Sequence, residues 1–499
     1  MTLHPQSSLF TKQTLERYSS NLFLPKGQSQ SRQYSFDGSP LPDLIATSEE
    51  GAALAIENSH SSFQRGLWRE STIEQRSSII IQATHALSAR SAEAAYLDAL
   101  ETGRSFFSLL NHSLPKAVKT ALWFCNSASN FGASSYKATT SHNLAFDSIT
   151  PFGSVLCILP WNDPLVLFCW KVIPALLMGN SVIVKPSEYS TGSALLFTDL
   201  LHSAGVPRDV LHVVVGRDAL ALNLLITDQR IRAISMTGSS ETAKYIQKHS
   251  SNFLRKLNFE CGGKSPFIVP DKLSASELHR CAEVLTRNMF YNQGQICSAP
   301  SLLIVNSHVF SELIPLIKEL SGSFLPGNPL ATNQIVGQMC TDSVLAKTES
   351  TLQAARQCQL EVWTHSGLSE SEHTSGRRSH PPSIIHCQSY TEYINNDFLH
   401  QEVFGPLLTV VVSNSFEEMI AIANLSAFGL ASSVWSSNIN TLIYFSDLID
   451  SGIVHFNTWG DDDIGIPFGG VKDSGQAREK CLESFSQFSY KKAIHIAVN

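Results

Sequence analysis

Residues 155–188 read VLCILPWNDPLVLFCWKVIPALLMGNSVIVKPSE, and the fold class can be inferred outward from them. The segment opens with the apolar run Val155–Leu159, continues with the longer apolar stretch Leu165–Met178 and closes with the short run Ser181–Val184. Two short β-branched runs on either side of a helix-length segment predict a strand, a helix and a strand. Because the helix crosses over between them, the two strands are expected to be parallel.

The same alternation continues along the chain. Further strands are expected at Val210–Val215, Ile231–Met236 and Phe267–Val269, and further helices at Ser193–Ala204, Ala219–Thr227 and Glu241–Ser250. These elements predict a doubly wound α/β lobe with a parallel sheet. A second block of the same class runs from about Glu260 to Ile449, with a helix at Ser276–Tyr291 and strands at Leu302–Val305 and Leu407–Val412. Two such lobes imply a cleft between them.

Segments outside the lobes are also informative. His365–Ser383 is rich in Ser, His, Gly and Pro and predicts a surface loop. Ser141–Phe146 and Phe485–Ile496 both have the pattern of extended chain and could pair as edge strands. Exposed edges favour association, so they are candidates for an oligomerisation element. The alternative is a terminal strand that covers its own subunit.

The composition bounds the class of protein and its partners. A chain of 499 residues with 43% hydrophobic and 16% charged residues is typical of a globular protein with two or three domains. The net charge of −7 provides no basic stripe for nucleic acid, so a small soluble substrate fits better. Ten cysteines without a C-x-x-C pair indicate a reducing compartment and suggest no metal site. No secretory signal and no uninterrupted apolar run of about 20 residues is present, so we expect a cytoplasmic protein without a membrane span.

Two motifs at strand ends indicate a dinucleotide, although no G-x-G-x-x-G follows a strand. Lys185 and Glu188 bound the first motif and suit ribose hydroxyls. In the second, Gly238 would let the backbone approach a pyrophosphate, and Ser239 and the following helix N-terminus would donate hydrogen bonds to it. The alternative is an ordinary strand-to-helix turn with an N-cap serine.

A cysteine, a glutamate and an asparagine form the candidate reaction site. Cys297 follows a helix in the turn Asn-Gln-Gly-Gln-Ile-Cys, where a thiol is exposed; the alternative is a small buried hydrophobe. Addition of a thiolate to a carbonyl carbon builds an oxyanion, which the Asn162 side chain and the Cys297 amide could stabilise. Once hydride has left to a nicotinamide, Glu260 could activate water against the resulting thioester; its alternative role is an N-cap or ion pair. Together the three residues indicate acyl chemistry.

These motifs occur in an order that resembles the aldehyde dehydrogenase superfamily. The resemblance rests on motifs within residues 100–480: Pro-Trp-Asn-Asp-Pro-Leu from Pro160, Lys-Pro-Ser-Glu from Lys185, Thr-Gly-Ser-Ser-Glu from Thr237, Glu-Cys-Gly-Gly-Lys-Ser-Pro from Glu260, Gly-Gln-Ile-Cys from Gly294, Glu-Val-Phe-Gly-Pro from Glu402 and Pro-Phe-Gly-Gly-Val-Lys-Asp-Ser-Gly from Pro467. It implies NAD(P)-dependent oxidation of an aldehyde to the carboxylic acid by a homodimer or homotetramer. It also implies a Rossmann-like NAD(P)-binding domain over residues 20–131 and 150–258, a catalytic domain over 259–452, and a small β oligomerisation arm over 132–149 and 480–499.

The resemblance assigns roles to individual residues. It implies Cys297 as nucleophile, Glu260 as general base, Asn162 as oxyanion donor, and Lys171 with Glu479 as a proton relay. The implied cofactor contacts are Pro160, Trp161, Lys185, Ser187, Glu188, Gly216, Thr237, Gly238, Ser239, Thr242, Glu402 and Phe404. NAD is the expected cofactor, with NADP as the alternative, because a carboxylate at Glu188 would repel a 2′-phosphate.

A closer resemblance concerns the substrate. Phe-Cys-Trp-Lys from Phe168, Phe-Tyr-Asn-Gln-Gly-Gln from Phe290 and the Pro-Phe-Gly-Gly segment are similar to γ-glutamyl-γ-aminobutyraldehyde dehydrogenases. The acidic run Asp461–Asp463 could place negative charge near the substrate mouth and favour an aminoaldehyde. Its alternative is a solvated acidic loop.

Four positions depart from the family pattern. Leu302 replaces an arginine, Ala243 a glycine, Asp163 an apolar residue, and Cys261 a leucine or alanine. The Ala243 methyl could narrow the approach of the pyrophosphate, and Asp163 could repel an anion. A CoA-acylating dehydrogenase and a thioester or ester hydrolase on the same scaffold are the competing enzymes, and Glu260 argues against the first. A non-catalytic structural protein is the third alternative.

Overall fold

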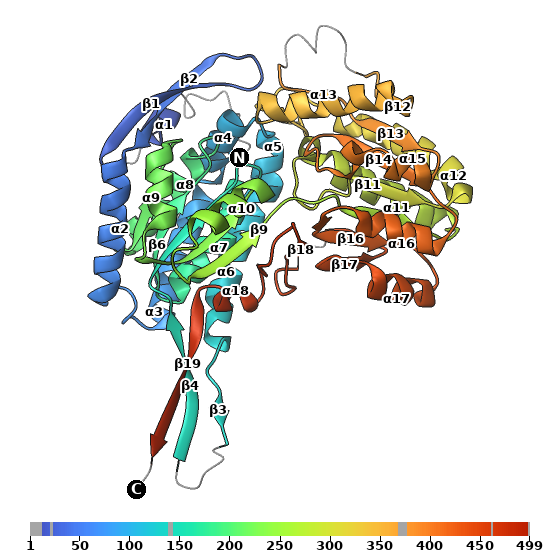
Figure 1. The fold of residues 1–499 in the computed structure, drawn as a ribbon. Helices are drawn as coiled ribbons and strands as arrows, with labels where there is room; N and C mark the ends of the chain where they lie inside the picture. The colour runs from blue at the N-terminus through green and yellow to red at the C-terminus, as the bar shows by residue number, and fades with distance from the viewer. Residues whose placement is uncertain (1–11, 20–22, 138–142, 368–376, 461–462, 498–499) are drawn as a thin grey trace.

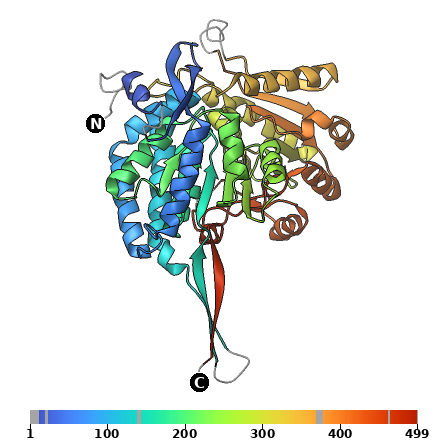
Figure 2. The ribbon, with the colours of Figure 1, turned by 60° about the vertical axis from the view of Figure 1, so that its left-hand side comes forward.

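The structure is a computed structural model that describes residues 12–19, 23–137, 143–367, 377–460 and 463–497. Two α/β lobes lie beside each other, and a β-strand arm projects away from both (Figures 1 and 2). The N-terminal half forms one lobe, and most of the chain after β9 forms the other (Figure 1). This confirms the predicted fold class of two doubly wound α/β lobes with a small β element.

A parallel sheet of five strands forms the centre of the first lobe. In spatial order the strands are β7 (Leu211–Val213), β6 (Ser181–Lys185), β5 (Ser154–Ile158), β8 (Ile231–Thr237) and β9 (Lys256–Glu260). Its helices are α2 (Glu49–Gln64), α3 (Ile73–Ala89), α4 (Ser91–Thr102), α6 (Leu114–Ser127), α7 (Pro164–Leu177), α8 (Gly192–Ala204), α9 (Ala219–Thr227) and α10 (Ser240–His249). Smaller elements are α1 (Lys12–Arg17), β1 (Lys26–Gln33), β2 (Pro40–Thr47), α5 (Phe106–Ser108), η1 (Leu109–Ser113) and η2 (Ala128–Asn130).

The sheet is covered on both faces because its strands are apolar on both. Val155 and Cys157 of β5 pack into a core with α3, α4, α6, α7 and α8. The intervening Leu156 packs into a second core with α2, α9 and α10. Successive strand side chains point to opposite faces, so a continuous apolar run requires helices on each side.

A seven-stranded sheet forms the centre of the second lobe, and all its pairs are parallel except β12 with β13. In spatial order the strands are β12 (Glu361–Thr364), β13 (Ser383–Cys387), β14 (Leu407–Val412), β11 (Leu302–Val305), β10 (Pro266–Val269), β16 (Ala431–Val434) and β17 (Ile453–Phe456). Helices α11 (Ala275–Phe290) and α12 (Ser307–Leu320) pack on one face, and α13 (Asp342–Gln357), α15 (Tyr390–Ile394), α16 (Phe416–Leu425) and α17 (Ile439–Leu448) on the other. Short elements complete the lobe: η3 (Tyr291–Gly294), η4 (Ser321–Phe324), η5 (Asp397–His400), β15 (Phe428–Gly429) and β18 (Val471–Lys472).

The arm is an antiparallel sheet of three strands in the order β19 (Ser489–Ala497), β4 (Asn143–Pro151) and β3 (Ser135–Tyr136). The short helix α18 (Glu483–Ser486) leads into β19. Ile494 pairs with Phe146, so the predicted pairing of the two extended segments is confirmed. The strand at the C-terminus begins at Ser489 and not at Phe485, which lies in α18, and Ser141 and His142 lie outside the described residues.

Two predictions about the sheets need correction. Phe267–Val269 is a strand, but it belongs to the second sheet as part of β10. The fifth strand of the first sheet is β9, which the sequence reading missed because buried Asn258 and Glu260 interrupt its apolar pattern. The other predicted helices and strands of both lobes are present with small shifts of their ends. The predicted surface loop His365–Ser383 falls partly on residues 368–376, which lie outside the described residues.

Within the described ranges, no helix combines the length and the apolar composition that crossing a bilayer requires.

Candidate active site

Side chains from four strand ends of the first lobe meet at one edge of its sheet. Asn162 lies in the loop after β5, while Lys185, Thr237 and Glu260 are the last residues of β6, β8 and β9. All these strands are parallel, and β9 points towards the second lobe (Figure 1). The carboxyl edge of the sheet therefore opens onto the cleft, where α/β proteins bind their ligands.

The second lobe contributes Cys297 on a tightly constrained turn after α11. Asn292 and Gln293 have φ of +53°, and Gly294 has φ of +70°. A Cβ on Gly294 would lie 2.2 Å from the carbonyl oxygen of Gly405, so only glycine fits there. The Gln295 side chain accepts a hydrogen bond from the Cys340 N–H (2.9 Å), which fixes the turn to the segment before α13.

The glycine pair after Glu260 lets the Cys297 turn approach β9. A Cβ on Gly263 would lie 2.8 Å from the carbonyl oxygen of Cys297, and one on Gly262 would lie 2.0 Å from Glu402 Oε2. The Gly263 N–H also donates to Glu402 Oε1 (2.9 Å). Residues 260, 297 and 402, far apart in the chain, are therefore neighbours.

Asn162 contacts the same turn. Its side chain is buried, and Nδ2 donates to the carbonyl of Gln295 (3.2 Å). An amide nitrogen carries two hydrogens, so one N–H of Asn162 remains for another acceptor. The structure thus brings together the three residues that the sequence predicted to act jointly.

The environment of Cys297 favours the protonated thiol. Burial raises the pKa of Cys297 to about 12, and the carboxylates of Glu260 and Glu402 act in the same direction. The other nine cysteines are also free, and all but Cys358 are buried. The thiolate therefore has to be generated during the reaction.

Glu260 is buried at the end of β9, and neither carboxylate oxygen has a hydrogen-bond partner among the described residues. Burial raises the pKa of Glu260 well above its ordinary value, and the negative charge of Glu479 adds to the shift. A Cβ on Gly469 would lie 2.6 Å from Glu260 Oε1, so the Pro467 motif covers this carboxylate. A buried carboxylate with a raised pKa is suited to accept a proton near neutral pH.

Lys171 and Glu479 form a buried ion pair behind Glu260. The ammonium group also donates to Ser235 Oγ (3.2 Å). Glu479 Oε2 has no partner within the described part of the chain, and its charge acts on Glu260. The charge of Lys171 also acts on Glu260, in the opposite direction to that of Glu479.

The end of β8 and the start of α10 form the predicted phosphate cradle. Ser239 is the N-cap of α10, and its Oγ accepts from the Thr242 N–H (3.2 Å), as the alternative reading of this motif expected. The Thr237 hydroxyl is buried and makes no hydrogen bond to any described residue. Gly238 lies between them, and the nearest atom to a Cβ there would be Met236 Sδ at 3.0 Å. An orphaned hydroxyl beside a helix N-terminus fits an anionic ligand.

The loop after β6 carries the predicted ribose site and a residue that sequence reasoning missed. Lys185 Nζ donates to the carbonyl of Pro186 (2.9 Å), and the Ser187 hydroxyl accepts from the Tyr189 N–H (3.3 Å). Glu188 forms an ion pair with Arg217, whose Nε lies 2.7 Å from Glu188 Oε1. Arg217 follows Gly216 in the loop after β7, and it belongs to none of the motifs identified in the sequence.

Two aromatic residues, Trp161 and Phe404, and the carboxylate of Glu402 are the contacts predicted for the nicotinamide end of the cofactor. The rings of Trp161 and Phe404 meet edge to face with centroids 5.5 Å apart, and Pro160 precedes this tryptophan. Phe404 has φ of +59°, a conformation that follows from the tight turn around Gly405. Burial raises the pKa of Glu402 to about 7, while the Gly263 N–H lowers it.

A cavity of about 980 Å³ opens beside the reaction site. Asn162, Ile296 and Ser298 form its inner wall next to Cys297. Its ionisable lining residues are Arg104, His112, Lys116, Asp163, Glu283, Arg287 and Tyr291. Sequence reasoning identified only Asp163 of this set.

The negative charge of Asp163 is neutralised by Arg104, which lies in the loop after α4. The buried Arg104 donates to Asp163 Oδ1 (2.8 Å) and to Ser113 Oγ (2.9 Å). The repulsion expected from Asp163 is therefore offset by a guanidinium group. Burial lowers the pKa of His112, and the positive charges of Arg287 and Arg104 lower it further.

The other departures from the family pattern lie in cores. Ala243 packs with Met236 and Phe259, so its methyl group points to the sheet and away from the cradle. Cys261 belongs to the same core, and Leu302 is fully buried in the second lobe.

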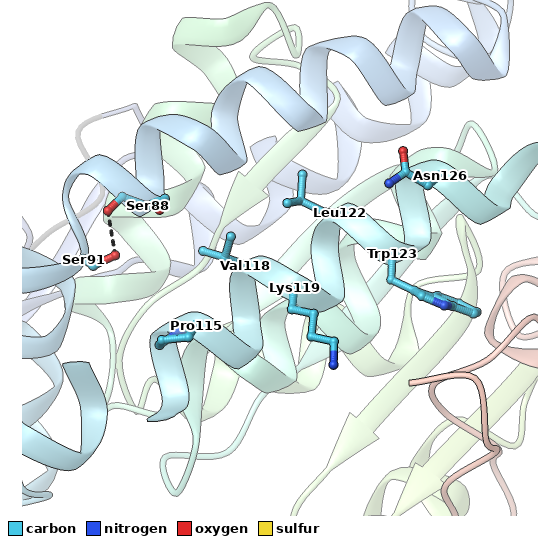
Figure 3. Close-up of a pocket in the computed structure, with 8 residues that line it drawn as sticks. All are labelled: Ser88, Ser91, Pro115, Val118, Lys119, Leu122, Trp123 and Asn126. Carbon is cyan, nitrogen blue, oxygen red and sulfur yellow. Dashed lines mark hydrogen bonds between the residues drawn. The ribbon is translucent and has the colours of Figure 1, made fainter. Parts of the chain in front are cut away.

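Figure 3 shows a separate hollow on the first lobe between α6 and the end of α3. Lys119 is the only charged side chain that lines it, among Ser88, Ser91, Pro115, Val118, Leu122, Trp123 and Asn126. None of these described lining residues is a cysteine or carries a carboxylate, so the hollow has no counterpart of the Cys297 site. The described residues also hold no group of three or more His, Cys, Asp or Glu side chains that could bind a metal ion.

Comparison with known proteins defines the class. A profile of the aldehyde dehydrogenase family matches residues 27–494, so the chain belongs to the aldehyde dehydrogenase family. It is 32% identical to the NADP/NAD-dependent aldehyde dehydrogenase PuuC of Escherichia coli over 443 residues, covering 87% of this chain and 86% of that protein. It is 30% identical to the aminoacetaldehyde dehydrogenase of Pseudomonas aeruginosa over 464 residues, covering 92% and 90%. The γ-glutamyl-γ-aminobutyraldehyde dehydrogenase structure from Burkholderia cenocepacia superposes with a TM-score of 0.89 at 28% identity, covering 95% of this chain and 94% of that one. The predicted enzyme class is confirmed.

Proposed function

We propose that the chain oxidises an aldehyde to the carboxylic acid with NAD or NADP through a covalent thiohemiacetal and thioester on Cys297. The observation that carries the proposal is the unpartnered, buried carboxylate of Glu260 next to the turn that bears this thiol. A nucleophile and a base at one point of a cleft are what acyl chemistry requires.

The first step joins the thiol to the substrate. Cys297 Sγ bonds to the aldehyde carbon, and the carbonyl π electrons move to the oxygen. The free N–H of Asn162 and the backbone N–H of Cys297 donate to that oxygen, a stabilisation of about 3 kcal/mol per preorganised donor. The thiol proton passes to Glu260, whose raised pKa makes it a competent acceptor.

The cofactor fits the carboxyl edge of the first sheet. The unpartnered Thr237 hydroxyl and the N-terminus of α10 suit a pyrophosphate, and Lys185 and Glu188 suit an adenosine ribose. Ser187, Gly216, Gly238, Ser239 and Thr242 would line this end of the site, and Pro160, Trp161, Glu402 and Phe404 the nicotinamide end. When bound, NAD or NADP supplies the acceptor for the hydride that leaves the substrate carbon, so that carbon becomes a thioester.

The last step releases the acid. Before this step Glu260 passes the proton that it took from the thiol to Lys171 and Glu479, which can carry it away from the site. The Glu260 carboxylate then removes a proton from water, the resulting hydroxide bonds to the thioester carbon, and the carbon–sulfur bond breaks. The thiolate leaves and takes the proton that Glu260 received from water. A protein that passed its acyl group to CoA would not need this base, so Glu260 favours hydrolysis over the CoA-acylating alternative.

The cavity supports a substrate with charge at its far end. Arg287 and Lys116 line it beside the ion pair of Arg104 and Asp163, and Glu283 adds a second carboxylate. A γ-glutamyl aldehyde carries a carboxylate and an ammonium group, so it matches a wall of mixed and mainly positive charge. We therefore propose an aminoaldehyde of the γ-glutamyl-γ-aminobutyraldehyde type. Asp461 and Asp462, which were expected to attract the amine, lie outside the described residues, and the exposed Asp463 accepts from the Gly465 N–H (2.8 Å).

We further propose the domain division expected from the sequence. Residues 20–131 and 150–258 would form the cofactor domain, 259–452 the catalytic domain, and 132–149 with 480–499 an arm that joins subunits into a homodimer or homotetramer.

A panel of aldehydes assayed with NAD and with NADP tests the function. The wild-type enzyme is expected to form NADH or NADPH with γ-glutamyl-γ-aminobutyraldehyde, and Cys297→Ala should lose this activity. Cys358→Ala is the matched control, because Cys358 is free and exposed. Unchanged turnover in Cys297→Ala would refute the mechanism, and turnover that required added CoA would favour the acylating alternative.

A further inference from the structure

The ribose end of the proposed cofactor site holds a second charged group that the catalytic steps do not use. Arg217 lies on the loop between β7 and α9, while Glu188 and Tyr189 follow β6. The guanidinium group bonds to Glu188 Oε1 through Nε (2.7 Å), donates to the Tyr189 hydroxyl, and lies 4.7 Å from the centre of the Tyr189 ring. These contacts hold it against the loop that carries the ribose-binding residues.

The backbone on either side of Arg217 is fixed. Gly216 has φ of +96°, and a Cβ there would lie 2.5 Å from the side chain of Ala46. On the other side, Asp218 caps α9 by accepting from the N–H groups of Leu220 (2.9 Å) and Ala221 (3.0 Å). The carboxylate of Asp218 is therefore occupied, and the arginine side chain is directed at the end of β6.

Glu188 alone would select against NADP, because a carboxylate repels the 2′-phosphate of its adenosine ribose. The positive charge of Arg217 beside Glu188 offsets this repulsion. Its side chain is 53% exposed and that of Glu188 is 24% exposed, so the guanidinium group lies on the solvent side of the carboxylate. An arginine has five N–H donors in a planar fork, and the ion pair with Glu188 and the bond to Tyr189 leave others for a phosphate dianion.

We propose that Arg217 recognises the 2′-phosphate of NADP, so that one site accepts NADP through Arg217 and NAD through Glu188. The inference rests on the proposed function, in which the first lobe binds the dinucleotide. Lys185 interacts electrostatically with both groups: burial lowers its pKa, the negative charge of Glu188 raises it, and the positive charge of Arg217 lowers it. At this end of the site, the positively charged groups are Lys185 and Arg217. The negatively charged groups are Glu188 and Asp218, the N-cap of α9.

Calorimetric titration of the substrate-free enzyme with two adenosine phosphates tests the proposal. The dissociation constant of 5′-ADP measures binding to the adenosine and 5′-phosphate site alone, and 2′,5′-ADP adds the 2′-phosphate. Arg217→Gln is expected to raise the ratio of the 2′,5′-ADP dissociation constant to the 5′-ADP dissociation constant by roughly 10- to 100-fold, the range for a charge-assisted pair with phosphate. Arg65→Gln is the matched control, because Arg65 is 55% exposed and paired with Asp209 at the opposite end of β7.

A double variant separates direct recognition from an effect exerted through Glu188. If Arg217 binds the phosphate, Arg217→Gln raises the ratio in a Glu188→Gln background as well. If it only screens the carboxylate, the ratio in that background does not change, and the proposal is overturned. We also expect the wild-type enzyme to lose its preference for 2′,5′-ADP at higher ionic strength, because salt screens an exposed ion pair.

The outcomes distinguish this inference from the proposed function. Binding of 5′-ADP with a ratio that does not respond to Arg217→Gln would overturn the role of Arg217 and leave the cofactor lobe in place. Absence of binding for both ligands would contradict the cofactor lobe itself, and with it the inference.

Discussion

Burial and negative charge act on Cys297 in the same direction, and both raise the pKa of its thiol. With a pKa of about 12, Cys297 is a protonated thiol at neutral pH. Glu402, which contributes to this shift, has a pKa of about 7 and so changes charge near neutrality. The reactivity of the thiol is therefore tied to the ionisation of a second residue.

Alkylation of the substrate-free enzyme by iodoacetamide should report this coupling. Glu402→Gln removes a negative charge that is present at pH 9, so the thiol pKa falls and Cys297 is alkylated faster than in the wild type. At pH 6 the wild-type Glu402 is already mainly protonated, and the two proteins should react at similar rates. The measurement is the modified fraction of the Cys297 peptide by mass spectrometry over time.

Glu283→Gln provides the control, because Glu283 is an exposed carboxylate of the same cavity that does not contribute to the Cys297 shift. Equal rates for wild type and Glu402→Gln at pH 9 would show that the carboxylate does not act on the thiol.

At the residue scale, the roles that the sequence predicts belong to residues in contiguous motifs. Cys297 and Glu260 stand in short motifs whose neighbours, such as Gly262 and Gly294, have a steric reason to be glycine. Arg217 and Arg104 lie in no such motif, because each acts on a distant residue. Arg217 contacts Glu188, 29 positions away, and Arg104 contacts Asp163, 59 positions away. Their roles depend on tertiary contacts, which a pattern of single residues does not contain.

At the scale of elements, the site depends on the close packing of the β9 end against the turn after α11. The strand β9 itself escaped prediction because Asn258 and Glu260 are polar yet buried, and Asn258 donates to the carbonyl of Gln487 (3.0 Å). Regular apolar elements such as β11, β14 and α9 were predicted with their observed ends. A strand that ends in a buried carboxylate cannot have an apolar pattern throughout.

Gly263→Ala tests this packing. The added Cβ would lie 2.8 Å from the carbonyl oxygen of Cys297, so the turn has to move, and we expect turnover to fall at least about tenfold. Gly132→Ala serves as control, because no atom lies within 4 Å of a Cβ at that position. Steady-state kinetics and the thermal unfolding midpoint should be measured together. Full activity in folded Gly263→Ala would show that the position of the turn is not critical.

At the scale of the whole molecule, most of the arm projects beyond the two lobes, and Ile149 at the base of β4 packs against the core of the first lobe. The strand β19 pairs along its length with β4, and Leu144, Phe146, Tyr490 and Ile496 remain exposed on the arm. An exposed apolar ribbon with free edges is a surface for association. The sequence indicated the pairing of these strands, but it left open whether they join subunits or cover their own.

Truncation after Phe488 should decide between these roles. It removes β19 but keeps the carbonyl of Phe488, which accepts from Asn180 Nδ2 (2.9 Å). If the arm joins subunits, the molar mass by light scattering should fall by a factor of two or more while the far-ultraviolet circular dichroism is nearly unchanged. An unchanged molar mass would assign the arm to its own subunit.

The central claim is that Cys297 carries the acyl group and Glu260 releases it. Glu260→Gln incubated with aldehyde and excess NAD should produce one equivalent of NADH per site, more slowly than the wild type because the thiol has lost its proton acceptor, and then stall. Peptide mass spectrometry of the acid-quenched protein should then find the acyl group of the substrate on the peptide that contains Cys297. Continued turnover without an adduct, or an acyl group on another residue, would contradict the account.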